Sequence, residues 1–149
     1  MSLELTIMDQ LKQAMRDKNE VALRTLRAIK AAILVEKTSV GAKDVLTAED
    51  ELKIIQKMVK QRKDSITIFE EQNRQDLADK EKEEVAVLNQ FLPKQLSLDE
   101  LKHEISTIIS NVGATSKADL GKVMGQASKV LAGQADGKDI ANVVKELLP

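Results

Sequence analysis

Apolar residues recur every three or four positions along most of the chain, and this spacing is typical of amphipathic α-helices. In the first part of the chain it predicts helices over about 5–17, 20–39, 48–73 and 76–92. The positions expected to be buried are Ile7, Met8, Leu11 and Met15; Ala22, Leu26, Ile29 and Ile33; Leu52, Ile55, Val59, Ile66 and Phe69; and Leu77, Val85, Leu88 and Phe91.

The second predicted helix carries apolar residues around most of its circumference, which indicates a central position in a bundle. Outside its expected buried stripe these are Val21, Leu23, Leu34 and Val35. The segment 40–47 contains Gly41 and is expected to be a loop.

Local signals mark where the next helices begin and end. Thr47 with Asp50 resembles a capping box, in which each side chain bonds the other residue's backbone N–H. Asn73 can adopt the left-handed conformation that ends a helix. Acidic and basic residues fill 79–84, and we expect this run to be mostly a solvated helix face.

The stretch from Phe91 to Ser97 divides the chain. Pro93 has no N–H to donate and disfavours helix in the residue before it, so the preceding helix should end there. Ser97 and Glu100 form a capping box that starts a new helix. We therefore predict a short proline-containing hinge between two domains, residues 1–92 and 93–149.

The second domain is predicted to hold three shorter helices. The first spans 98–112 and ends at Gly113, the second starts after Ser116 and ends at Gly133, and the third starts after Asp136. Their expected buried positions are Leu98, Leu101, Ile105, Ile108 and Val112; Leu120, Val123, Met124, Ala127 and Leu131; and Ile140, Val143, Val144, Leu147 and Leu148. The predicted fold is thus all-α, an N-terminal four-helix domain followed by a small C-terminal three-helix domain.

The amino-acid composition excludes several kinds of core and functional site. Aromatic residues make up only 1% of the chain against 42% hydrophobic residues, so the cores must be aliphatic. The absence of cysteine excludes disulfides, thiolate zinc sites and thiol nucleophiles. The net charge of −1 lacks the basic excess of a dedicated nucleic-acid binder, so any such contact must be local. Without a membrane-length apolar run or signal-peptide pattern, we expect a cytoplasmic protein with no membrane partner.

Motifs that suggest catalysis do not hold up. The glycine and lysine residues from Gly133 to Lys138 have the wrong spacing for a phosphate-binding loop. Glu100 and His103 have the Glu-x-x-His spacing of di-iron bundles, but such sites need a second pair and the chain has one histidine. We expect no catalytic residue, cofactor or metal. Gly121 and Gly125 lie one helical turn apart, which predicts close approach of a neighbouring helix.

Basic residues are the remaining candidates for a functional site. A secondary basic face is predicted on the long helix at Lys53, Lys57, Lys60 and Lys63. Arg62 falls at a missing step of that helix's apolar stripe, so it must either extend to solvent or meet a carboxylate. In the second domain the lysines are Lys117, Lys122, Lys129 and Lys138. A row of lysines is ordinarily only a solvent-exposed helix face. The open alternative is that these lysines bind the phosphates of double-helical RNA.

Four segments carry a family resemblance. They are 61–65, 92–96, 116–124 and 135–138, with the sequences QRKDS, LPKQL, SKADLGKVM and ADGK. In this order and spacing they resemble the YqeY family, small bacterial proteins similar to the helical and tail region of the B subunit of glutamine-dependent tRNA amidotransferase. The resemblance covers nearly the whole chain.

The resemblance implies an all-α fold and a role with tRNA, because the similar region of the amidotransferase helps to hold and discriminate the tRNA. It also implies the family label of carbon–nitrogen ligase with glutamine as amide donor, although the chain lacks a nucleotide loop and a nucleophile for that chemistry. Lys117, Lys122 and Lys138 fall within the tail motifs and are the first candidates for tRNA contacts.

Two hypotheses follow. The first is a non-catalytic tRNA-binding accessory module, with an amidotransferase or an aminoacyl-tRNA synthetase as a protein partner. The alternative is a helical interaction module that docks on a partner subunit of a tRNA-charging or amidation complex. The oligomeric state is left open by the sequence.

Overall fold

The computed structural model describes residues 2–39, 41 and 45–149. In this part of the chain it has seven α-helices, one short 3-10 helix and no strand, so the fold is all-α as predicted. The chain divides into two compact units, Met1–Leu92 and Pro93–Pro149. The expected loop over 40–47 lies partly outside the described residues.

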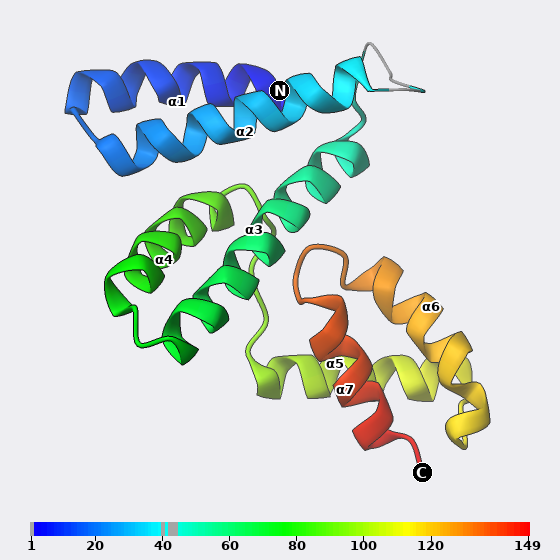
Figure 1. The fold of residues 1–149 in the computed structure, drawn as a ribbon. Coiled ribbons are helices and arrows are strands. Elements are labelled where there is room, and N and C mark those ends of the chain that lie inside the picture. The colour runs from blue at the N-terminus through cyan, green and yellow to red at the C-terminus, as the bar shows by residue number, and fades with distance from the viewer. Residues whose placement is uncertain (1, 40, 42–44) are drawn as a thin grey trace. The chain divides into compact units, whose positions relative to one another are not determined.

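The first unit contains α1 (Leu3–Asp17), α2 (Glu20–Thr38), α3 (Ala48–Glu71) and α4 (Gln75–Asn89). Figure 1 shows α1 and α2 as an antiparallel pair, with α3 and α4 forming a second pair. Helix α2 packs against all three of the others, so its predicted central position is confirmed. Helix α1 packs mainly along α2.

The core of the first unit is aliphatic, but its members differ in part from those predicted. Ile7, Leu26, Ile29, Ile33, Ile55, Val59 and Leu88 are buried as expected, and Ala14, Ile54, Met58 and Ala78 are buried in addition. Met8 and Met15 were predicted to be buried, and that prediction is wrong because both are exposed. Helix α1 has two apolar stripes, and the one through Ile7 and Ala14 faces α2.

The wide apolar surface of α2 is only partly covered. Leu34 and Val35 are 62% and 65% exposed, because they lie near the C-terminal end of α2 on a side that no other helix of the unit covers. Thr25 is the one buried polar residue in the described chain, and its hydroxyl donates to the carbonyl of Val21 at 2.8 Å. This bond to the preceding turn satisfies a hydroxyl that has no access to water.

Two of the predicted helix-end signals are confirmed. Thr47 and Asp50 form the reciprocal capping box that starts α3. Asn73 adopts a left-handed φ of 57° between α3 and α4. A third signal was missed: Lys18 ends α1 with a φ of 53°, a conformation that lysine adopts only at some cost.

The second unit follows the predicted pattern closely. It contains α5 (Leu98–Val112), the 3-10 helix η1 (Lys117–Asp119), α6 (Leu120–Val130) and α7 (Gly137–Leu147). The capping box of Ser97 and Glu100 is present, and Gly113 ends α5 with a left-handed φ of 69°. Each of α5, α6 and α7 packs on the other two, around a fully apolar core. Only Leu98 departs strongly from expectation, being 59% exposed.

Candidate nucleic-acid interface

Helix α6 presents one side to the core and the opposite side to solvent. Val123 and Ala127, with Leu131 just beyond the helix, are buried against α5 and α7. Lys122 and Lys129 are seven residues apart, which is about two helical turns or ~10 Å, so they lie nearly in line on the exposed side. The structure therefore brings these two candidate lysines together on one face.

The outer face of α6, which we define as Lys122, Gly125, Gln126 and Lys129, is free of negative charge. The sequence has no carboxylate from 120 to 135. Among the described residues neither lysine takes part in an ion pair within 4.0 Å. Their ammonium groups are therefore available to an external anion.

The glycines of α6 do not do what the sequence suggested. A Cβ placed on Gly121 or Gly125 would meet nothing within 4 Å, so the predicted close approach of a neighbouring helix within the unit is wrong. Glycine inside a helix costs about 1 kcal/mol relative to alanine. Nothing inside the folded unit offsets this cost, and the exposed backbone there is accessible from outside.

Lys117 and Lys138 are not part of this row. The backbone N–H of Lys117 donates to the carbonyl of Pro149 at 3.2 Å, just past the C-terminal end of α7. Lys138 is in the first turn of that same helix. An eleven-residue helix is about 16 Å long, so these two lysines lie at opposite ends of α7. The four tail lysines are exposed but spread out.

One carboxylate borders the row at its N-terminal end. Asp119 accepts a hydrogen bond from the N–H of Thr115 at 3.0 Å. This bond, together with the positive charge of Lys122, holds the pKa of Asp119 below its usual value. Asp119 is therefore a structural acceptor that stays ionised, and it marks the edge of the basic row.

The secondary basic face on α3 is partly neutralised. Lys53 pairs with Glu49 at 3.3 Å, and Lys60 pairs with Asp64 at 3.2 Å. Both are exposed pairs four residues apart, a type that contributes only a few tenths of a kcal/mol. Lys57 and Lys63 are exposed and have no ion pair in the described part of the chain.

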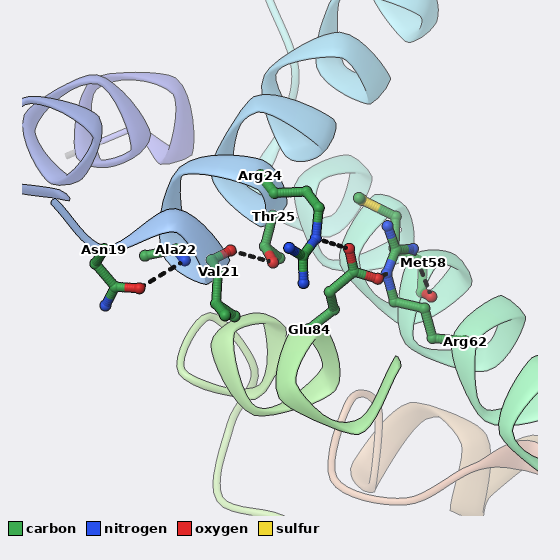
Figure 2. Close-up of polar contacts among 8 residues, drawn as sticks. All are labelled: Asn19, Val21, Ala22, Arg24, Thr25, Met58, Arg62 and Glu84. Carbon is green, nitrogen blue, oxygen red and sulfur yellow. Dashed lines mark hydrogen bonds and ion pairs between the residues drawn. The ribbon is translucent and has the colours of Figure 1, made fainter. Parts of the chain in front are cut away.

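Arg62 is the charged residue that the structure places deepest among the candidates. The sequence left two arrangements for Arg62, extension to solvent or pairing with a carboxylate. The structure shows the pairing, because Nε of Arg62 lies 3.3 Å from an oxygen of Glu84. The other oxygen of Glu84 accepts from Nε of Arg24 at 2.9 Å (Figure 2). One carboxylate from α4 thus joins an arginine from α2 and another from α3.

This three-residue cluster is structural in character. Arg62 also donates to the carbonyl of Met58 at 3.2 Å, within its own helix (Figure 2). The run 79–84 was expected to be mostly solvated, and residues 79, 80, 82 and 83 are exposed, but Glu84 is an exception because its side chain is only 12% exposed. The signal was present in the sequence: Glu81 and Glu84 continue the spacing from Leu77 to Leu88, which puts both carboxylates on the inner side of α4.

Neither a metal site nor a membrane-spanning helix is present among the described residues. No group of three or more histidine, cysteine or acidic side chains in them could hold a metal ion. No helix among them is both long enough and apolar enough to cross a bilayer. His103 is exposed on α5, as its position outside the apolar stripe indicated.

These features define a class: an all-helical protein of two compact units, with a locally basic helix face in the second. The family is fixed by comparison with known proteins. The model of the YqeY family, described as Yqey-like protein, matches residues 4–148. The chain belongs to this family, as the resemblance of its motifs indicated.

Curated relatives are fungal. The chain is 32% identical over 142 residues to altered inheritance of mitochondria protein 41, mitochondrial, from Pyrenophora tritici-repentis, covering 93% of this chain and 76% of the relative. It is 30% identical to the protein of the same name from Clavispora lusitaniae, covering 93% and 81%. A protein of Schizosaccharomyces pombe without an assigned function is 32% identical over 64% of this chain and 76% of its own length.

These names correct one expectation. From the sequence we expected a cytoplasmic location, and this is contradicted because two relatives that match over 93% of this chain are named as mitochondrial proteins. The sequence argument rested on the lack of a secretory signal and of a membrane span, and neither feature distinguishes the cytoplasm from the interior of an organelle.

Proposed function

We propose that this chain is a non-catalytic accessory module that binds tRNA through its second unit, in support of tRNA amidation or charging. The protein partner in this proposal is an amidotransferase or an aminoacyl-tRNA synthetase. The similarity of its motifs to the tRNA-holding region of the amidotransferase B subunit supports the choice of ligand.

The observation that carries the proposal is the outer face of α6. Lys122 and Lys129 are in line, have no ion pair in the described chain and flank Gly125, whose bare backbone leaves room for a phosphate group. Contacts of this kind read the shape of a folded RNA rather than its bases. The lack of tryptophan and tyrosine argues against single strands, which need aromatic side chains for stacking.

The test is a titration of unfractionated tRNA against the wild type and the double variant Lys122→Ala, Lys129→Ala over a range of salt concentrations. Each lost phosphate contact should lower the salt slope of the binding constant by about one unit. The matched control is Lys53→Ala with Lys60→Ala, which removes the same charge from the first unit and should leave the slope unchanged.

Two results would overturn the proposal. One is a wild type that does not bind tRNA at low salt. The other is an equal loss of affinity in the control and the α6 variant, since this would show that tRNA responds to net charge rather than to this face. Adding Lys117→Ala and Lys138→Ala one at a time then shows how far the contact extends along the unit.

The alternative from the sequence keeps one supporting observation. Ala118, Gly121, Gly125, Ser128 and Ala132 are all small and exposed, and they are spaced by three and four residues along η1, α6 and the turn after α6. Such small residues let another protein helix approach closely. Under this alternative, capture of an amidotransferase or synthetase subunit should survive ribonuclease treatment and be lost on Gly125→Leu, with tRNA affinity absent.

A further inference from the structure

The exposed side of α1 carries a row of apolar residues that the first unit does not use. Leu5, Met8 and Met15 are 54%, 43% and 53% exposed. With Lys12 they are spaced by three, four and three residues, so they share one side of the helix. Since α1 packs mainly along α2 through its other stripe, no helix of this unit covers the row.

A matching row lies beside it on α2. The two helices are antiparallel neighbours (Figure 1), and the ion pair of Glu4 with Lys37, at 2.7 Å, fixes their register. Met8 is one turn after Glu4 on α1, and Leu34 is one turn before Lys37 on α2. Because the two helices are antiparallel, moving from Glu4 to Met8 and from Lys37 to Leu34 leads in the same direction in space. Met8 and Leu34 are therefore neighbours on the side of the hairpin marked by this ion pair.

Continuing by helical turns from Leu34 along α2 gives Lys30 and Arg27, both exposed. We call the seven exposed residues the hairpin face: Leu5, Met8, Lys12 and Met15 from α1, with Arg27, Lys30 and Leu34 from α2. Single exposed apolar residues are ordinary, but a continuous set on two adjacent helices marks an interaction surface.

The charge on the hairpin face has one sign. Lys12, Arg27 and Lys30 have no ion pair in the part of the chain that the structure describes. The sequence has no carboxylate from 21 to 35, and Glu4 at the end of the face is already held by Lys37. The face is thus apolar and mainly cationic; among the described residues Asp9, three residues before Lys12 on α1, is an exposed carboxylate at its border.

We propose that the hairpin face binds an amphipathic α-helix of a partner protein, with leucine-type residues against the methionines and acidic residues against the cations. Flexible, polarisable methionines are suited to accepting a helix along its apolar side. Carboxylates on the incoming helix supply negative charge that complements the net positive charge of Lys12, Arg27 and Lys30. This site is separate from the α6 face and does not depend on tRNA binding.

Two other occupants fit less well. A second copy of the chain, paired about a twofold axis, would set the same patch against itself and bring the cations together. A lipid bilayer would have to bury Lys12 and Lys30, which lie among the apolar residues of the hairpin face, and the face has no aromatic residue for the membrane interface. An amphipathic acidic helix can cover the apolar residues and also pair with the cations.

Methionine methyl NMR on the full chain tests this site with internal controls. The probe is a synthetic amphipathic helix of about five turns with leucines on one side and glutamates on the other. The methyl signals of Met8 and Met15 should shift on titration. Those of Met58, buried in the same unit, and Met124, in the other unit, should not.

A charge swap sharpens the test. In the variant Lys12→Glu, Lys30→Glu the affinity for the glutamate peptide should fall about tenfold, and a matched lysine peptide should bind instead. Both changes are at exposed positions, and circular dichroism checks that the helices persist.

Three results would overturn the proposal. They are unshifted Met8 and Met15 signals, shifts that arise from raising the protein concentration alone, and shifts produced by phosphatidylglycerol vesicles but not by the peptide. The second would assign the face to self-association and the third to a membrane surface.

Discussion

The two units differ in how completely their helices cover one another. In the second unit each of α5, α6 and α7 packs on both of the others, and nearly every apolar position predicted to face inward does so. In the first unit α1 leans mainly on α2, and apolar residues such as Met8 and Leu34 are left outside. Periodicity identifies the apolar side of a helix, but the number of neighbours decides how much of that side is buried.

The units also differ in polar content. The core cluster of the second unit is entirely apolar, whereas the first unit holds Glu84 between Arg24 and Arg62 at the junction of three helices. Two nitrogen atoms of these arginines, Nη2 of Arg24 and Nε of Arg62, are buried without a hydrogen-bond partner in the described structure. The first unit therefore depends on an arrangement of charges that the second does without.

The largest effect should come from the apolar core of the second unit. Ile105 is fully buried, and replacing it with alanine should lower the free energy of unfolding by about 3 kcal/mol through lost burial and a cavity. Met15→Ala in the first unit should change it by less than about 0.5 kcal/mol, because that side chain is half exposed. Urea titrations followed by circular dichroism measure both, and equal losses would contradict the contrast in coverage.

Glu84→Ala should be next in size. It removes the carboxylate that pairs with both arginines and leaves only Glu81 nearby. This should destabilise the first unit by about 2 kcal/mol, less than for a fully buried cluster because Arg24 is 38% exposed. The matched control is Glu83→Ala, an exposed neighbour on the same helix. If the two variants unfold at the same urea concentration, the cluster does not contribute to the stability of the unit.

A smaller effect, of opposite sign, is expected at the glycines of the second unit. Gly125→Ala should stabilise the unit by about 1 kcal/mol, because alanine favours the helix and its Cβ meets nothing. Gly113→Ala should destabilise by a similar amount, about 1 kcal/mol, because its φ is positive. Thermal unfolding of both variants measures the contrast, and a weaker tRNA affinity in the stabilised Gly125 variant would support the proposed interface.

The smallest expected effect is on the pH dependence of the free energy of unfolding. One carboxyl group in each unit should contribute to it, and the two contributions should have opposite signs. Burial, with the nearby charge of Glu84, raises the pKa of Glu81 in the first unit. A carboxyl group of raised pKa favours the folded state most at low pH, and this contribution is lost as the pH rises through the folded pKa. Glu81→Gln should therefore stabilise the chain at neutral pH and make little difference in acid.

In the second unit the hydrogen bond from Ser97 holds the pKa of Glu100 below its usual value. A carboxylate of lowered pKa contributes stability above its unfolded pKa and loses it as the pH falls through the folded one. Glu100→Gln should thus destabilise at neutral pH and converge with the wild type in acid. Unfolding curves at several pH values test both signs, and parallel behaviour of the two variants would refute the assignment.

The candidate site was only partly visible in the sequence. The four tail lysines could be named, but their grouping was decided by the fold, which aligns Lys122 with Lys129 and sends Lys117 and Lys138 to opposite ends of α7. The role of Glu84 could have been suggested by its spacing with Leu88 on α4. Its partners could not, because Arg24 lies 60 residues away in the chain.

By itself the sequence determined the all-α class, the ends of most helices and the core of the second unit. These features rest on local interactions: the Ser97 cap, the Pro93 break and the left-handed Asn73 involve residues within a turn of each other. Only the tertiary structure decided which apolar stripe of α1 was buried, which arginine met Glu84 and which glycines faced open space. Such outcomes depend on how distant helices pack, and periodicity within one helix carries no information about its neighbours.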